Sequence, residues 1–366
     1  MSISGKARLV FPGGNTSLGF YSFSDQIIDH NFNRLFILKG GPGVGKSTLI
    51  KNVGKRLLEK GYDLEYHCCS SDKNSYDGLI VPALKIAIFD GTAPHIMDPK
   101  YPGAVDEIVN LGAYWSEKGL VAKKEDIFRL TKETKHLFAR AYNYLAQAKL
   151  LNDDLESYYQ VCNSLDIKNA NLISNQLIKE ILNTDKEPSE PKVRNLFASA
   201  ITPQGLINHL PSLFDDLDKR YIITGPSGSG KATIVKKIYL AAVNFGHQVE
   251  AFHCSLLPTQ LEHLILPELS IGVITSAGHH IYQPKPNDTV ISTGKLIDYD
   301  LLKPYTNDIA EAARRFDGAL KRGLEFLSKV KEYRDQLEAI YISNMDFEAL
   351  KICRERLILK IESLTG

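Results

Sequence analysis

Short apolar runs alternate along the chain with longer stretches in which apolar residues recur every three or four positions. Runs at 35–38, 64–70, 84–90 and 107–111 have the length and the β-branched content of buried strands. A stretch with helical periodicity follows the first of them. Apolar strands that alternate with helices are typical of a parallel sheet covered on both faces, so we predict an α/β fold.

A second pattern, with a period of three to four residues, extends from Ile127 to Leu155. It predicts a helix of roughly 30 residues, about 45 Å long. A similar stripe runs from Ile309 to Val330, and a shorter helical stretch follows each of the two. Ser343 opens the last stretch with a spacing close to that of a capping box. Such stripes usually pack against helices or a sheet, and a lid or a dimerisation arm is the alternative interpretation.

The same order of predicted strands and helices occurs twice in the chain. RLFILKGGPGVGKSTLIKNVGKRL begins at Arg34, and KRYIITGPSGSGKATIVKKIYLA begins at Lys219. The match continues downstream, where YHCCSSD at Tyr66 faces FHCSLLP at Phe252. Each half is too long for a solenoid repeat, so we predict two duplicated domains. The matched positions include His67 with His253, Cys68 with Cys254, Pro82 with Pro267, His95 with His280, and Pro99 with Pro284.

Two domains of similar length follow from this repeat. We predict a first domain at 1–185, which includes a helical arm at 121–182. The second domain is predicted at 193–366, with its own helical arm at 305–365. Between them, the segment NTDKEPSEPK is polar and charged and contains two prolines, so we place a linker at 186–192.

The first half contains a glycine loop with the spacing G-x-x-x-x-G-K-S, between a predicted strand and a predicted helix. Glycines allow backbone N–H groups to converge on phosphate oxygens, and the following helix directs its positive end at the same anion. The lysine is expected to reach the β- and γ-phosphates, and the serine hydroxyl to bind Mg²⁺. The predicted nucleotide-binding residues are Gly40, Gly41, Gly43, Val44, Gly45, Lys46, Ser47 and Thr48.

Asp90 ends an apolar run, where the carboxyl edge of a parallel sheet binds ligands. We therefore predict that Ser47 and Asp90 bind Mg²⁺, and that Lys46 and Asp90 act in catalysis. Gly91 follows Asp90, so no glutamate stands beside it to polarise water. Asp72 is the predicted catalytic base, with Asp77 as its alternative, both in a segment whose composition favours a loop.

The second half keeps the glycines and the lysine but departs from the pattern at two positions. Ala232 replaces the hydroxyl residue, and Thr275 aligns with Asp90. The adjacent Thr233 points about 100° away on the helix and does not replace Ser47. The second loop is thus expected to bind a nucleotide without turnover, to bind another anion, or to complete the first site. Its predicted binding residues are Gly225, Ser227, Gly228, Ser229, Gly230, Lys231, Ala232 and Thr233.

Two further features have open interpretations. His95 and His280 persist in both halves, which favours a role in packing or a turn at least as much as sensing of a phosphate. The segment FPGGNTSLGFYSF could place Phe20 or Tyr21 against a nucleotide base, or form a structural loop.

Charge and composition exclude several classes of function. Lys and Arg number 44 against 43 Asp and Glu, so there is no strong signal for nucleic acid. No apolar run approaches the roughly 18–20 residues of a membrane helix, and the first residues lack a signal-peptide core. The five cysteines form no C-x-x-C pair. We expect a cytoplasmic protein without a membrane segment, a zinc ribbon or a redox motif.

The stretches GGPGVGKST and GPSGSGKAT resemble those of the P-loop nucleoside triphosphatases. In combination with GGNTSLGFYSF, HCCSSD, FDGTAPH and DPKYPGAVDEIVNLG, they resemble a family of bacterial tandem P-loop, ATPase-like proteins over most of residues 8–365. The resemblance implies two P-loop domains that bind ATP, and says little about the substrate. The departures at Ala232 and Thr275 weigh against hydrolysis in the second half.

Three functions are consistent with these patterns. The first is a slow, Mg²⁺-dependent ATPase or nucleotide-driven switch, in which the second loop is regulatory and the helical arms report the bound nucleotide. The second is a small-molecule or nucleotide kinase, with Arg129 or Arg140 as charges of a lid. The third is a non-enzymatic nucleotide sensor or scaffold whose arms bind a protein partner or a second copy of the chain.

Overall fold

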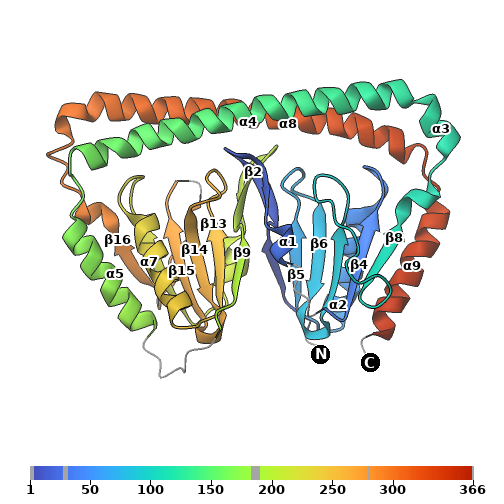
Figure 1. Cartoon of the computed structure of the whole chain (residues 1–366), viewed down its shortest axis with the longest axis horizontal. Helices are drawn as coiled ribbons and strands as arrows, with labels where there is room; N and C mark the ends of the chain where they lie inside the picture. The colour runs from blue at the N-terminus through green and yellow to red at the C-terminus, as the bar shows by residue number, and fades with distance from the viewer. Residues whose placement is uncertain (1–3, 28–31, 183–189, 279, 365–366) are drawn as a thin grey trace.

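The computed structural model describes residues 4–27, 32–182, 190–278 and 280–364. The linker predicted at 186–192 lies mostly outside these ranges. The described residues form an α/β structure with two six-stranded sheets side by side and a pair of long helices across both (Figure 1). No helix in these ranges combines the length and the apolar content that crossing a membrane requires.

The first sheet surrounds the strand that leads into the first glycine loop. Its strands are parallel to their neighbours except β6, which runs antiparallel to both strands beside it. In spatial order they are β1 (Ala7–Val10), β5 (Leu64–Cys68), β6 (Tyr76–Val81), β7 (Ile86–Asp90), β4 (Arg34–Lys39) and β8 (Asp106–Asn110).

The second sheet has the same strand order and directions. Its antiparallel member is β14, which corresponds to β6. The strands, in the equivalent order, are β9 (Val193–Leu196), β13 (Val249–His253), β14 (Leu261–Leu266), β15 (Ile271–Ser276), β12 (Lys219–Thr224) and β16 (Thr289–Ser292). The sheets are therefore mixed, and mostly parallel.

The strand β6 is a departure from the sequence prediction, which read Asp77 as part of a loop. Three strands, β5, β6 and β7, follow one another with no α-helix between them. The turn between β6 and β7 is a 3₁₀ segment, η1 (Pro82–Leu84), which ends at Lys85 with a left-handed φ of 53°. Such a turn reverses the chain too tightly for a crossover helix, so β6 has to run antiparallel.

Short elements complete each half. The hairpins β2–β3 (Gly13–Thr16 and Gly19–Ser22) and β10–β11 (Ser199–Thr202 and Gly205–Asn208) lie beneath the long helices, and the short helices α1 (Ser24–Ile27) and α6 (Leu210–Phe214) lie near the joint (Figure 1). The other 3₁₀ segments are η2 (Leu111–Tyr114), η3 (Pro267–Leu269), η4 (Thr293–Leu296) and η5 (Lys303–Tyr305).

Alternate residues of each strand enter different cores. Phe36 and Leu38 of β4 pack with helix α2 (Lys46–Glu59). Leu35 and Ile37 point to the other face, into a cluster that also includes Ile222 from the second sheet. The two sheets thus share one apolar core, and only their outer faces carry the helices that follow the glycine loops.

The predicted helical arms are present, and the long helix of each extends beyond the apolar stripe that predicted it. The first comprises α3 (Glu117–Ala122), α4 (Lys124–Val161) and α5 (Ile167–Ile181), and the second comprises α8 (Thr306–Ile342) and α9 (Phe347–Ser363). Helices α4 and α8 lie along each other over both sheets (Figure 1). They approach closely at Gly323, where a Cβ would lie 2.9 Å from the side chain of Leu145.

Each arm packs on the opposite half, whereas the sequence assigned each arm to its own domain. Leu350 and Leu357 of α9 share a core with the first sheet, and Leu177 and Ile181 of α5 share a core with the second. Helix α5 lies against α7 (Lys231–Asn244), the helix that follows the second glycine loop. Because α4 and α8 span both sheets, each carries its shorter helix across the joint (Figure 1).

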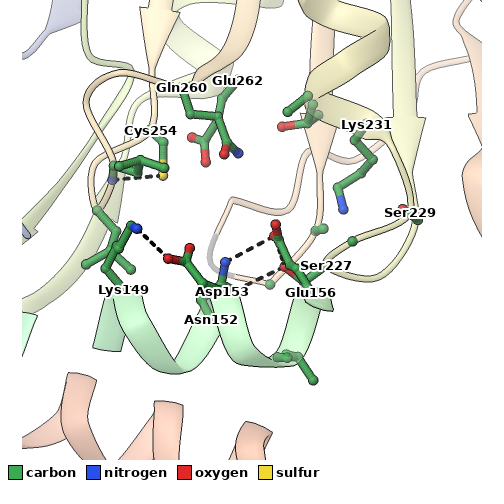
Figure 2. A pocket seen from close by; sticks show the side chains of 18 of the residues that line it. Lys149, Asn152, Asp153, Glu156, Ser227, Ser229, Lys231, Cys254, Gln260 and Glu262 are labelled. Carbon is green, nitrogen blue, oxygen red and sulfur yellow. Dashed lines mark hydrogen bonds and ion pairs between the residues drawn. The ribbon is translucent and has the colours of Figure 1, made fainter. Parts of the chain in front are cut away.

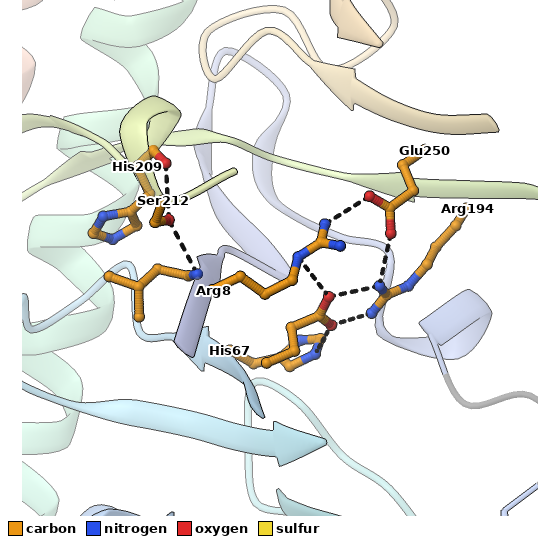
Figure 3. Close-up of polar contacts among 8 residues, drawn as sticks. Arg8, His67, Arg194, His209, Ser212 and Glu250 are labelled. Atoms are coloured by element: carbon orange, nitrogen blue, oxygen red, sulfur yellow. Dashed lines mark hydrogen bonds and ion pairs between the residues drawn. The ribbon is translucent and has the colours of Figure 1, made fainter. Parts of the chain in front are cut away.

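Two buried carboxylates and two half-buried guanidinium groups join the two halves beside the shared core. Arg8 on β1 pairs with Glu65 at 3.3 Å and with Glu250 at 2.6 Å. Arg194 on β9 pairs with the same two carboxylates, and His67 lies 2.8 Å from Glu65 (Figure 3). Glu65 is fully enclosed, yet these two guanidinium groups and His67 hold its pKa well below the usual value against the effect of burial. The network thus links β1 and β5 of the first sheet to β9 and β13 of the second.

Candidate functional site

The first glycine loop, residues 40–47, follows β4 and leads directly into α2. Gly43 and Gly45 have φ values of 73° and 87°, a region that favours glycine over other residues. Gly45 is the N-cap of α2 and has no side chain to satisfy the first amides of the helix. Backbone N–H groups at this end of the helix are therefore available to an anion.

The predicted lysine and aspartate lie together at the loop. Nζ of Lys46 donates to the carbonyl oxygens of Gly40 at 2.9 Å and Gly41 at 2.8 Å. It lies 3.5 Å from Oδ2 of Asp90. Burial lowers the pKa of Lys46, and burial raises the pKa of Asp90, each partly offset by the opposite charge. The ion pair holds both side chains beside the glycine loop.

The two predicted metal ligands line one cavity. Oγ of Ser47 accepts a hydrogen bond from the backbone N–H of Tyr76 at 2.9 Å. Asp90 accepts hydrogen bonds from the N–H of Thr92 at 2.9 Å and from its hydroxyl at 2.5 Å. Hydroxyl and carboxylate oxygens suit Mg²⁺, which commonly takes one or two protein ligands together with phosphates and water. No group of three or more His, Cys, Asp or Glu in the described ranges could bind a metal alone.

The cavity at the first loop has a volume of about 290 Å³ and is lined mainly by polar and charged groups. Predicted residues from Gly43 to Thr48, with Asp72, Asp77 and Asp90, form one side. Helix α8 of the second half forms the other, and contributes Lys331, Arg334, Glu338 and Ile342. The site thus needs both halves of the chain, which the sequence did not predict.

Helix α8 lies directly on the glycine loop. A Cβ at Gly43 would lie 2.9 Å from the carbonyl oxygen of Glu338, and a Cβ at Gly41 would lie 2.7 Å from the ring of Tyr341. Any larger residue would displace the helix. The loop therefore needs these glycines for close contact with the opposite arm as well as for its own conformation.

Arg334 is the group that sequence analysis missed. Its half-buried guanidinium lines the first cavity, and no described residue forms a hydrogen bond or an ion pair with it. Neighbouring Lys331 lies 3.4 Å from Asp72, so that aspartate already has a cationic partner. An unpaired guanidinium beside a glycine loop favours an anionic ligand.

A repeated spacing in the arms could have revealed this position. Lysine, aspartate, glutamate and tyrosine recur with the same separations on the face of each long helix. In both helices the lysine forms an ion pair with the aspartate four residues later. The pattern comprises Lys149, Asp153, Glu156 and Tyr159 on α4, and Lys331, Asp335, Glu338 and Tyr341 on α8. Arg334 and Asn152 directly precede the two aspartates and so correspond to each other.

Asp77 lies on β6, is 8% exposed, and faces the first cavity. Nε2 of His95 lies 3.2 Å from its carboxylate. Burial is the largest influence on His95, but the hydrogen bond and charge of Asp77 together raise the pKa of that histidine above its usual value. Glu262 and His280 form the equivalent pair in the second half, at 3.1 Å. The paired histidines therefore have a defined partner in each half.

The second loop, residues 225–232, repeats the local geometry. Gly228 and Gly230 have φ values of 77° and 85°, and Nζ of Lys231 donates to the carbonyls of Gly225 at 2.8 Å and Pro226 at 2.5 Å. Burial lowers the pKa of Lys231. A cavity of about 480 Å³ opens beside it, and Ala232, Thr233 and Thr275 lie in its wall.

Helix α4 of the first half covers the second loop. Oε1 of Glu156 accepts hydrogen bonds from the hydroxyl of Ser227 at 2.7 Å and from Nδ2 of Asn152 at 3.0 Å. A Cβ at Gly228 would lie 2.6 Å from the ring of Tyr159. Figure 2 shows the polar side chains of α4 directed at the loop that carries Ser227, Ser229 and Lys231. Each long helix thus covers the glycine loop of the other half, an arrangement we call the exchange of arms.

Four side chains considered in the sequence lie away from the cavities. Arg129 is exposed and pairs with Asp126, and the exposed Arg140 lies over the rings of Tyr144 and Phe326. The ring of Phe20 contacts His95 edge-on, and Tyr21 contacts Phe23 and Phe197. Tyr21 therefore belongs to the joint between the halves, whereas the ring contact of Phe20 stays within the first half. The hairpins that carry their segment and its counterpart reach across the joint, as Ser17 N donates to Leu256 O at 2.9 Å.

Comparison of the chain with models of protein families, with curated proteins and with solved structures finds no match in any of the three.

Proposed function

We propose that the protein binds ATP with Mg²⁺ at the first loop and hydrolyses it slowly, as a nucleotide-driven switch. One observation carries the proposal: Lys46, Ser47 and Asp90 line one polar cavity with the unpaired guanidinium of Arg334. Three of these groups come from the first half and one from the arm of the second. A bound triphosphate would therefore hold the two halves together.

Each group has a distinct role in this proposal. The amides of the loop and of the first turn of α2 bind the phosphates, and Lys46 exchanges its carbonyl partners for phosphate oxygens. Ser47 and Asp90 are the residues that would hold Mg²⁺, which neutralises phosphate charge when bound. Arg334 contacts the terminal phosphate and stabilises the charge that develops there.

The base that accepts a proton from water is better assigned to Asp77 than to Asp72. Asp77 extends from a buried strand into the cavity and is oriented by His95. Asp72 already pairs with Lys331. No glutamate follows Asp90, because Gly91 occupies that position. Slow turnover follows from the absence of a second carboxylate at the end of β7.

The arms provide the route by which such a switch would act. The C-terminal end of α8 contacts the first loop, and the C-terminal end of α4 contacts the second. A ligand at the first loop that moves α8 also acts on α4, which packs along it. This arrangement supports the switch more directly than a kinase, since Arg129 and Arg140 lie outside both cavities.

Phosphate release from ATP tests the proposal. We expect Mg²⁺-dependent release by the full-length protein, its loss in Lys46→Ala, and its retention in Lys231→Ala, which changes the matching lysine of the second loop. Acceptor-stimulated formation of ADP would instead favour the kinase. Absence of ATP binding by the folded wild-type protein would refute the proposal.

A further inference from the structure

The second cavity is larger than the first and different in character. Its volume is about 480 Å³, against about 290 Å³ at the first loop. Its lining combines the second glycine loop with apolar side chains that include Leu256, Leu257 and Leu320. This volume lies within the range of sites for small organic ligands.

Three groups suited to a metal-bound triphosphate are replaced in this cavity. Ala232 stands for Ser47, Thr275 for Asp90, and Asn152 for Arg334. The first two replacements remove the metal ligands. The third removes a fixed positive charge, because the amide of Asn152 is neutral and donates to Glu156.

The charge of the lining also argues against a triphosphate. The cations Lys149 and Lys231 face the carboxylates of Asp153, Glu156 and Glu262, and His280 pairs with Glu262. The lining therefore carries no excess of positive charge. A ligand that adds about two negative charges is far easier to hold here than one that adds about four, since no metal ion offsets the excess.

One oxygen of a buried carboxylate in the same cavity lacks a hydrogen-bond donor. Glu262 is 7% exposed, and its Oε2 atom makes no hydrogen bond with any described residue. The other oxygen, Oε1, lies 3.1 Å from Nε2 of His280. Nε2 of His263 is 3.8 Å from Oε2, and burial lowers the pKa of His263 to about 3, so this ring is neutral. A buried acceptor atom without a hydrogen-bond donor favours a ligand that donates a hydrogen bond to it.

We propose that the second cavity binds, without a metal ion, a phosphate monoester whose organic part carries hydroxyl groups. The phosphate would occupy the loop beside Lys231, one hydroxyl would donate to Glu262, and the body would lie against the leucine wall. The inference shares one assumption with the proposed function, namely that a glycine loop of this kind binds phosphate. A nucleoside monophosphate and a sugar phosphate share this chemistry.

Calorimetric titration of the full-length protein in EDTA tests this inference. The probes are AMP, ribose 5-phosphate and inorganic phosphate, which separate a nucleotide, a sugar ester and the phosphate alone. We expect at least one ester to bind without Mg²⁺ and more tightly than inorganic phosphate. Binding should weaken at least tenfold in Lys231→Ala and in the near-isosteric Glu262→Gln.

Matched changes in the first half provide the control. Lys46→Ala and Asp77→Asn alter the corresponding residues of the first cavity and should leave ester binding within about twofold. The inference is overturned if no ester binds to the folded wild type, if binding requires Mg²⁺, if inorganic phosphate binds as tightly as the esters, or if the first-half variants weaken binding equally. ATP turnover by the same samples reports on the first loop separately, so either proposal can fail alone.

Discussion

Replacing Arg334 with alanine tests whether the arm of the second half completes the first site. The guanidinium lines the cavity beside Lys46 and forms no hydrogen bond or ion pair with the described residues. Its removal therefore breaks no hydrogen bond or ion pair among the described residues, and the free energy of unfolding should change by no more than about 0.5 kcal/mol. The loss should instead appear when an anion binds.

A hydrogen bond to a charged group contributes about 1.5–3 kcal/mol. If Arg334 contacts the terminal phosphate, its loss should lower kcat/KM for ATP about 10- to 150-fold. Removing this cation should also raise the pKa of Lys46, since Arg334 is among the influences that lower it, after burial. The assay is steady-state phosphate release with saturating Mg²⁺, alongside urea denaturation of the same samples.

Arg314→Ala is the matched control, because this arginine lies on the same helix with its side chain 73% exposed and paired with Glu311. Unchanged turnover in Arg334→Ala would refute the role of the arm in this site. A large loss of stability in that variant would show instead that Arg334 supports the fold.

Three further predictions concern other parts of the molecule. Glu65→Gln should lower the free energy of unfolding by about 3–5 kcal/mol in urea titrations, because the fully buried Glu65 is one of two carboxylates that the half-buried Arg8 and Arg194 share. Glu59→Gln, at an exposed ion pair, should change it by less than about 0.5 kcal/mol. The difference in melting temperature between wild type and His95→Gln should shrink as the pH rises. The pKa of His95 is raised in the folded state, so its stabilisation is complete below the unfolded pKa of about 6.5 and is lost as the pH rises through the folded pKa. A difference that stays constant from pH 6 to 9 would contradict the pairing of His95 with Asp77. In a Lys46→Ala background, Ala232→Ser combined with Thr275→Asp should allow the second loop to bind ATP in a Mg²⁺-dependent manner, as measured by calorimetry. ATP binding that does not depend on Mg²⁺ would show that these two positions do not define the metal site.

The position of Asp90 beside Lys46 was predictable from two short segments of the sequence. The spacing of Gly40, Gly45 and Lys46 fixes a loop between a strand and a helix, and Asp90 ends the strand beside it. Parallel pairing of β4 and β7 then brings the aspartate to the lysine. Neither step needs information from the rest of the chain.

The exchange of arms was not predictable from the same patterns. The apolar stripes of α4 and α8 indicate packing but do not specify which half receives the helices that follow. Leu350 and Leu177 would satisfy either core by composition, and the choice depends on the length of the long helices. Arg334 was missed for this reason, since it belongs to the first site only through that exchange.

The antiparallel strands were missed for a different reason. The segment that contains Asp77 begins with Ser, Asp, Lys and Asn, which favour a loop, and β6 starts only at Tyr76. Pairing on both sides buries the strand and places Asp77 beside His95. The apolar residues that follow Gly78, with Pro82 at their end, were the available signal of a strand.

A crystal structure with Mg²⁺ and a non-hydrolysable ATP analogue tests the central claim most directly. The account predicts a metal ion bound by Ser47 and Asp90, with the guanidinium of Arg334 on the terminal phosphate. Magnesium beside Ala232 and Thr275, or a triphosphate at the first loop with Arg334 turned away from it, would contradict the account.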